Sequence, residues 1–240
     1  MRSHFLRAVS KTSPPAFVGA VGNAAAQSQN YTINLASLSG GTDSSPSAGD
    51  LIVIVNGCTS SSTNLNSTGV VTSGFTQIGS RLDSNDTRTT STWVSYKISD
   101  GTEASITVRG NGTGSSYGNA AVAHVWRNIN QTTPLDVTTT TATGINTGRP
   151  NVPSVTPVTA GAIILGVGYG ALATTAVALT AAGLSNVHTA EIGASSGGGA
   201  AIIAAYTAWT SGAYDMAQFG GGSTNNANSW GAAAVVLRPA

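Results

Sequence analysis

The sequence predicts an all-β protein: a single antiparallel β-sandwich, jelly-roll-like, with an internal pseudo-duplication and an extended N-terminal arm. Three observations lead to this fold class: the composition, a series of short strand-like runs, and a repeat of those runs. Charged residues make up 8% of the 240-residue chain, against about 25% in an average soluble domain. Solubility must therefore come from Ser, Thr, Asn and Gly. Because Thr and Val favour strands while Gly and Asn favour turns, the composition indicates β structure.

Strand-like apolar runs follow one another along the chain, separated by turn-forming clusters such as SGGTDSSPS and SSSTNLNSTG. In the first half the runs are 16–21, 31–36, 50–57, 75–82, 90–98, 104–110 and 119–127. In the second half they are 134–142, 162–170, 184–193, 200–209, 214–222 and 230–238. The alanine-rich stretch that starts near residue 160 is not predicted to be a helix, because each of its glycines would weaken a helix by roughly 1 kcal/mol. These glycines are Gly161, Gly166, Gly168 and Gly170.

The second half of the chain repeats landmarks of the first half. AGDLIVIV at residues 48–55 returns as AGAIILGV at residues 160–167, an offset of 112. Four further pairs recur in the same order at nearly the same offset: Gly74-Phe75-Thr76 with Gly183-Leu184-Ser185, Tyr96 with Tyr206, Gly101 with Gly212, and Arg127 with Arg238. The pattern indicates a degenerate duplication, with halves at about 46–127 and 158–239.

The duplication limits the domain organisation. A unit of about six strands cannot bury both faces of its sheet alone, so the halves are expected to pack face to face as one sandwich over residues 17–240. The alternative is two tandem immunoglobulin-like domains, since about 100 residues suffice for each. The strand-like segment PLDVTTTTATG crosses the midpoint, where a linker between independent domains would be expected, and it favours the single sandwich.

Residues 1–16 are predicted to form an extended N-terminal arm. The first eleven residues carry three basic and no acidic side chains, although the whole chain has a net charge of only +1. Pro14-Pro15 stiffens the exit from this segment. The arm therefore has the makeup of a docking segment, with a frayed terminus as the alternative. Its candidate docking residues are Arg2, Phe5, Leu6, Arg7, Val9 and Lys11.

The N-terminal sequence, the lengths of the apolar runs and the net charge limit where the protein is expected to act and what it is expected to bind. The N-terminal order of basic, apolar and small residues matches that of a signal peptide, but prolines and glycines interrupt the apolar part. The sequence contains no run of about 18 apolar residues, so no membrane span and no membrane partner are expected. After the arm the net charge is −2, which argues against a nucleic-acid partner, because such proteins carry a basic face.

The residues that could carry chemistry do not form a recognisable catalytic or metal-binding motif. Cys58 is the single cysteine and is expected to be a small residue at the end of a strand. The histidines are His4, His124 and His188; His124 is expected to be a satisfied or surface histidine. No HxH, HExxH or CxxC spacing occurs. The sequence therefore predicts no enzyme, no cofactor and no metal site.

Two acidic segments contain side chains that could form a site. Asp83, Asn85 and Asp86 supply the oxygen ligands that Ca²⁺ prefers, but too few carboxylates follow, so an ordinary turn is expected. Asp100 and Glu103 are three residues apart, and Asp100-Gly101 is typical of a hairpin turn. GVGYG at residues 166–170 lacks the GK[ST] of a phosphate loop.

The tryptophans offer an alternative function. Trp93, Trp126, Trp209 and Trp230 all lie in expected strands, where packing in the core is the default. If two of them faced solvent together, they would form a stacking platform for a sugar. A glycan is therefore the alternative partner.

The strand pattern resembles a known family. AGDLIVIV, GFTQI, TWVSYKISDGTE with ITVRG, and AAVAHVWR are repeated more loosely as AGAIILGV, GLSNV, AAYTAW and AAAVVLRP. This order, over roughly residues 46–239, resembles β-sandwich virion structural proteins of tailed bacteriophages. The chain departs from the pattern at Ala162, which replaces the acid equivalent to Asp50, and at Leu184, which replaces an aromatic residue.

The resemblance implies localisation in the virion and a structural role without enzymatic activity. The expected function is that of a capsid-surface (decoration or cement) or other head-associated subunit, with capsid or tail proteins as partners and a homo-oligomeric state. The alternative is a tail-associated or cell-surface glycan-binding adhesion module. The sequence has no long coiled-coil or collagen-like shaft, which favours the head-associated role.

Overall fold

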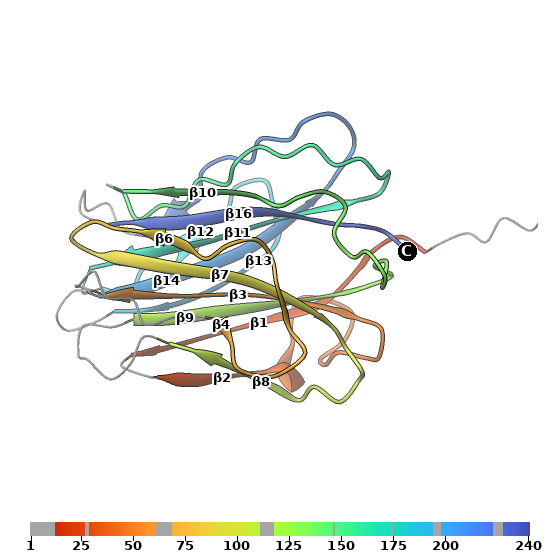
Figure 1. The fold of residues 1–240 in the computed structure, drawn as a ribbon, viewed down its shortest axis with the longest axis horizontal. Coiled ribbons are helices and arrows are strands. Elements are labelled where there is room, and N and C mark those ends of the chain that lie inside the picture. The colour runs from red at the N-terminus through yellow and green to blue at the C-terminus, as the bar shows by residue number, and fades with distance from the viewer. Residues whose placement is uncertain are drawn as a thin grey trace, which may run out of the picture.

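The structure, a computed structural model, is built almost entirely from β-strands (Figure 1). It describes residues 13–26, 29–60, 69–110, 118–145, 147–173, 175–193, 198–222 and 228–240. Within these residues one short 3₁₀ helix occurs, η1 (Leu35–Ser37), which Asn34 caps by accepting a hydrogen bond from the Ala36 amide. No helix among the described residues is long and apolar enough to cross a membrane.

The first half of the chain forms one antiparallel sheet, called sheet 1. Its strand order is β1-β9-β3-β7-β5, and β6 also pairs with β7. The bounds of these strands are β1 (Ala16–Ala26), β3 (Leu51–Ser60), β5 (Thr76–Gln77), β6 (Leu82–Ser84), β7 (Thr89–Ile98) and β9 (Gly118–Arg127).

The second half forms sheet 2, with the order β10-β16-β11-β14-β13. Its strands are β10 (Thr140–Gly144), β11 (Ile163–Leu172), β13 (Ser185–Ile192), β14 (Gly199–Ala208) and β16 (Trp230–Leu237). Since β1, β9, β3, β7 and β5 correspond in turn to β10, β16, β11, β14 and β13, the two sheets have the same topology.

The register confirms the duplication residue by residue. In sheet 1, Val53 pairs with Tyr96, and at the equivalent place in sheet 2 Leu165 pairs with Tyr206. The edge strands match in the same way, because Thr76 pairs with Tyr96 and Ser185 pairs with Tyr206. The turns before β3 and β11 both contain a glycine with positive φ, Gly49 at 87° and Gly161 at 80°.

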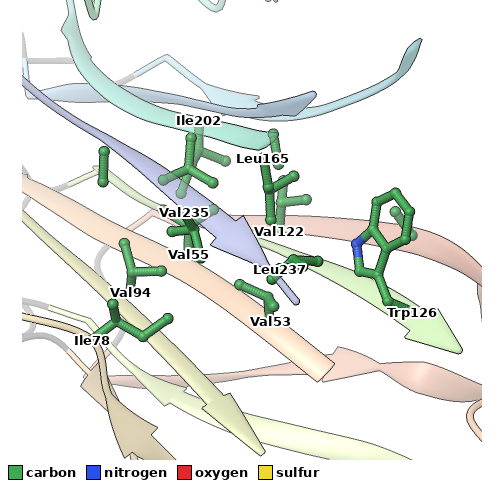
Figure 2. Close-up of a cluster of buried hydrophobic side chains, with 14 of the residues drawn as sticks. Val53, Val55, Ile78, Val94, Val122, Trp126, Leu165, Ile202, Val235 and Leu237 are labelled. Atoms are coloured by element: carbon green, nitrogen blue, oxygen red, sulfur yellow. The ribbon is translucent and has the colours of Figure 1, made fainter. Parts of the chain in front are cut away.

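The two sheets pack face to face around one shared hydrophobic core (Figure 2). Sheet 1 contributes inward-facing side chains of β3, β7 and β9, such as Val53, Val55 and Val122. Sheet 2 contributes Leu165 from β11 and Val235 from β16. Because residues of both halves form this single core, the halves are the two layers of one sandwich and not tandem domains.

A further layer covers the outer face of each sheet, which explains why the central strands are buried along their whole length. On sheet 1 the cover is a small sheet of β2 (Asn30–Asn34), β8 (Ser105–Arg109) and β4 (Gly69–Val70), with Ile33 and Ile106 packed against Ile52 and Ile54. On sheet 2 it is the pair β12 (Leu179–Thr180) and β15 (Gly220–Gly221), together with flanking segments that include Val152, Met216 and Phe219.

The predicted β-sandwich with pseudo-duplication is confirmed, and the jelly-roll detail is not. In this chain each half completes one sheet before the other begins, whereas a jelly roll is built from two Greek keys spread over two sheets. Three predicted strands were too long. Residues 134–142, which were expected to continue strand-like across the midpoint, enter β10 only at Thr140 and otherwise contain an isolated bridge at Leu135. Residues 75–82 divide between β5 and the start of β6, and residues 214–222 contain only an isolated bridge at Tyr214 and the short β15. The expected strand 31–36 ends early, because η1 begins at Leu35.

Candidate functional site

The chain enters the sandwich and leaves it at one end, called here the arm end (Figure 1). The Asn128 side-chain amide donates a hydrogen bond of 2.9 Å to the Pro14 carbonyl, and the Ala240 amide donates one of 3.0 Å to the Asn128 carbonyl. The candidate docking residues Arg2, Phe5, Leu6, Arg7, Val9 and Lys11 lie outside the described residues. The described chain before β1 is Ser13–Pro15, and β1 itself begins at Ala16.

Two arginines at the arm end each hold a buried aspartate. Arg127, at the end of β9, makes a bidentate contact of 2.9 Å to both oxygens of Asp50, and it also contacts Asp43 at 2.8 Å. The Ser47 amide donates to the same Asp50 carboxylate. Asp50 therefore ties the turn before β3 to the end of β9.

The second pair lies at the end of sheet 2. Arg238, at the end of β16, lies 3.3 Å from Asp136, whose side chain is fully buried. Asp136 also accepts hydrogen bonds from the Val158 and Thr159 amides and from the Thr159 hydroxyl. Burial would raise the pKa of this carboxyl, but its hydrogen bonds from Thr159 and Val158 hold it below its usual range. The position in the second half that corresponds to Asp50 is Ala162, so the carboxylate that contacts Arg238 comes from Asp136 instead.

Asp100 and Glu103 hold the connection from β7 to β8. Glu103 accepts hydrogen bonds from Lys97 Nζ at 2.6 Å and from the Ser99 hydroxyl at 2.6 Å. Burial of this carboxyl opposes ionisation, and the hydrogen bonds from Lys97 and Ser99 lower its pKa to about 2. Asp100-Gly101 was expected to form a hairpin turn. The turn does not join two paired strands, because β7 and β8 belong to different sheets. The acid pair thus joins sheet 1 to its cover.

The acidic segment around Asp83 and Asp86 is held by contacts within the chain. The Arg81 guanidinium lies 2.6 Å from the Asp83 carboxylate. Asp86 accepts a hydrogen bond from the adjacent Thr87 amide, as in an ordinary turn. Within the described parts of the chain, His, Cys, Asp and Glu side chains form no group of three that could hold a metal ion.

The four tryptophans occupy separate places. Trp126 lies buried in the shared core, which agrees with the default expectation for a strand tryptophan. Trp93 lies on the opposite face of sheet 1, beneath Gly69 of β4. Trp209 and Trp230 both pack on the outer face of sheet 2, but β14 ends before Trp209 at the arm end, and β16 starts with Trp230 at the far end.

Cys58 is fully buried in β3. Burial raises the pKa of its thiol far above the ordinary value, so the reactive thiolate is suppressed. Cys58 is a packing residue, as the sequence indicates.

A cluster of histidines and aromatic rings lies where β1, at the edge of sheet 1, packs against β13, at the edge of sheet 2. His124, on β9, has its ring centroid 5.2 Å from that of Phe17 and 5.5 Å from that of His188, on β13. Tyr206 and Trp126 complete the cluster, with ring centroids 4.5 Å apart. We call these five residues the histidine seam.

The structure corrects the expectation for His124. Its side chain is 1% exposed, so it is not a surface histidine, and neither ring nitrogen makes a hydrogen bond of good geometry, although the Ala204 backbone lies within reach of the ring. Burial lowers its pKa to about 3, with a smaller effect from the neighbouring His188. The contact with the Ala204 backbone acts in the opposite direction and is the weakest of the three effects, so His124 is neutral.

Sequence reasoning named His188 and Trp126 but did not predict that they lie together with His124. His188 is 64 residues from His124 and on the other sheet, so no spacing motif links the two. His188 Nε2 lies 3.4 Å from the Ser39 hydroxyl, which is longer than the roughly 2.6–3.2 Å of a nucleophile and its base. His188 Nδ1 lies 3.2 Å from the Asn186 carbonyl.

Comparison with protein-family models, with curated proteins and with solved structures finds no match to this chain. The resemblance to virion proteins of tailed phages therefore depends on the strand pattern alone.

Proposed function

We propose that the chain is a non-enzymatic structural subunit of a tailed-phage virion, most directly a capsid-surface (decoration or cement) or other head-associated protein. It would act as a homo-oligomer in contact with other virion proteins. The observation that carries this proposal is how the chain uses its buried carboxylates. Asp50, Glu103 and Asp136 all bind an arginine or lysine and main-chain or hydroxyl donors, and each joins one structural element to another.

A second feature supports the same proposal. The surface depends on Ser, Thr, Asn and Gly for its polarity, since charged residues are 8% of the chain. Each sheet is covered on its outer face, so the edges and ends of the sandwich are left for contacts with partners. The glycan alternative needs two exposed indoles side by side, and the four tryptophans do not meet in this way.

The proposal is tested with particles made by the genome that encodes the chain. Gradient-purified particles should contain the protein at a fixed copy number per particle when measured by quantitative mass spectrometry. A chain lacking residues 2–13 should fold, because β1 begins at Ala16, and its copy number should fall at least tenfold. Absence of the full-length protein from washed particles would overturn the structural role, and full incorporation of the shortened chain would overturn the docking arm alone.

A further inference from the structure

Because of the duplication, His124 can be compared with the residue at the equivalent position of the other sheet. This residue pairs with Val53 on β3, and the equivalent residue of sheet 2, Val235, pairs with Leu165 on β11. Val235 is fully buried, as His124 nearly is. The fold therefore accepts an apolar side chain at this position, and packing alone does not require an imidazole. A buried imidazole that makes no hydrogen bond of good geometry is a candidate ligand for a cation.

His188 is directed into the seam by an irregularity of β13. The pairing of β13 with β14 shifts register between Ser185 and His188, and a bulge of this kind re-aims a side chain. Asn186, inside the irregularity, has a φ of 44°, which non-glycine residues rarely adopt. The backbone of Gly40 lies close against the ring, since a Cβ there would be 3.1 Å from His188 Cε1.

The hydrogen bonds of His188 leave one nitrogen free to bind. With Nδ1 protonated and donating to the Asn186 carbonyl, Nε2 carries the lone pair and has only the long contact to Ser39. Histidines that bind metals commonly donate their other ring N–H to a carbonyl or carboxylate in this way.

We propose that His124 and His188 bind one divalent transition-metal ion, such as Zn²⁺ or Cu²⁺, in the histidine seam. The ring centroids are 5.5 Å apart, close to the roughly 5 Å expected when two imidazole nitrogens each approach one ion at about 2.0–2.1 Å. The Ser39 hydroxyl or solvent would fill the remaining positions. Imidazole suits Zn²⁺, Cu²⁺ and Ni²⁺, whereas Ca²⁺ and Mg²⁺ need oxygen ligands.

The ion would link β9 of sheet 1 to β13 of sheet 2 and so close one side of the sandwich. This inference goes beyond the proposed virion role and does not depend on it, because it concerns the isolated chain.

The test uses full-length protein with His4→Gln, which removes the third histidine of the chain. After treatment with a chelator, the protein is titrated calorimetrically with Zn²⁺, Cu²⁺, Ca²⁺ and Mg²⁺. One Zn²⁺ or Cu²⁺ ion should bind per chain and raise the thermal midpoint, with no effect of Ca²⁺ or Mg²⁺. The electron paramagnetic resonance spectrum of the Cu²⁺ form should show hyperfine coupling to imidazole nitrogen.

Two variants locate the ion. His124→Val places in sheet 1 the residue that sheet 2 already has, and His188→Gln changes a half-buried side chain, so both should keep the native circular dichroism spectrum. Each should weaken binding at least tenfold, while the His4→Gln parent and wild type bind equally. Lack of binding by the parent, or unchanged binding by both folded variants, would overturn the proposal.

Discussion

The two halves of the sandwich share strand order and register, but they differ where they face each other. The inward-facing position that is Gly57 in β3 is Tyr169 in β11, at the offset of 112 that relates these strands. A Cβ on Gly57 would overlap the Tyr169 ring. The Tyr169 hydroxyl in turn lies 2.8 Å from the Thr59 hydroxyl and donates to the Gly118 carbonyl at 3.0 Å. After the duplication, the inner faces of the two sheets have thus become complementary: the glycine on sheet 1 leaves the space that the tyrosine ring of sheet 2 fills.

The halves also differ in how they secure their ends. Both arginines are retained, but the partner of Arg127 directly precedes β3, whereas the partner of Arg238 precedes β10. The serine and threonine that donate amides to these acids, Ser47 and Thr159, are again 112 residues apart. The comparison indicates that each of these arginines needs a buried carboxylate beside it, while the segment of the chain that provides the carboxylate can differ.

The largest expected effect separates the two arginine pairs. Asp136→Ala should cost about 3–4 kcal/mol of unfolding free energy, because two amides and the Thr159 hydroxyl lose their acceptor and Arg238 loses this carboxylate, keeping the Thr133 hydroxyl and the main-chain carbonyl of residue 136. Asp50→Ala should cost less, about 2 kcal/mol, since Arg127 keeps Asp43. Urea denaturation of both variants provides the measurement. Equal losses would show that Asp43 contributes nothing.

Gly57→Ala should cost about 2–3 kcal/mol, because the added methyl group overlaps the Tyr169 ring. If the contact between the halves is the cause, Gly57→Ala should cost much less in a Tyr169→Leu background. A double-mutant cycle measures this coupling. Strict additivity would place the strain of Gly57→Ala elsewhere in sheet 1.

The turn after β7 and the turn after β14 are closed by different interactions, and pH separates them. The first uses the Glu103 carboxylate, while in the second the Trp209 indole donates to the Gly212 carbonyl at 2.9 Å. The pKa of Glu103 is depressed to about 2, so its stabilisation is complete above the unfolded value of about 4.3 and is lost as pH falls towards 2. This contribution should be about 1–2 kcal/mol after screening by solvent.

Glu103→Gln should remove that part of the acid dependence when unfolding free energy is measured from pH 5 to pH 2. Trp209→Phe, the matched change in sheet 2, should leave the pH profile unaltered. An unchanged profile for Glu103→Gln would mean that another carboxylate, such as Asp136, accounts for the loss at low pH.

The smallest expected effect concerns the hydroxyl that links the sheets. Tyr169→Phe keeps the ring over Gly57 and removes two hydrogen bonds, so it should cost about 1 kcal/mol. Thr59→Val removes the other partner, and the double variant should lose little more than either single one. Thermal or urea unfolding measures all three, and a much larger loss in the double variant would indicate that the two hydroxyls act independently.

Much of the fold could be predicted from the sequence because its signals are local. The apolar runs of β3, β7, β9, β11, β14 and β16 and the low charge indicate strands without reference to any partner. The repeated landmarks at Tyr96 and Tyr206 predicted a duplication that the pairing register confirms. The positions of the arm residues Arg2 to Lys11 stay a prediction, since they lie outside the described residues.

The sequence by itself determined the fold class, the strand series and the two-part organisation, because composition and periodicity act between neighbours in the chain. Only the tertiary structure decided which distant residues meet. His124 and His188 come from different sheets, Asp136 replaces the acid absent at Ala162 from a different loop, and Tyr169 fills the space above Gly57. Each contact depends on the register of two sheets packed face to face. A one-residue shift would turn every side chain of a strand to its other face, so no local pattern could have specified these contacts.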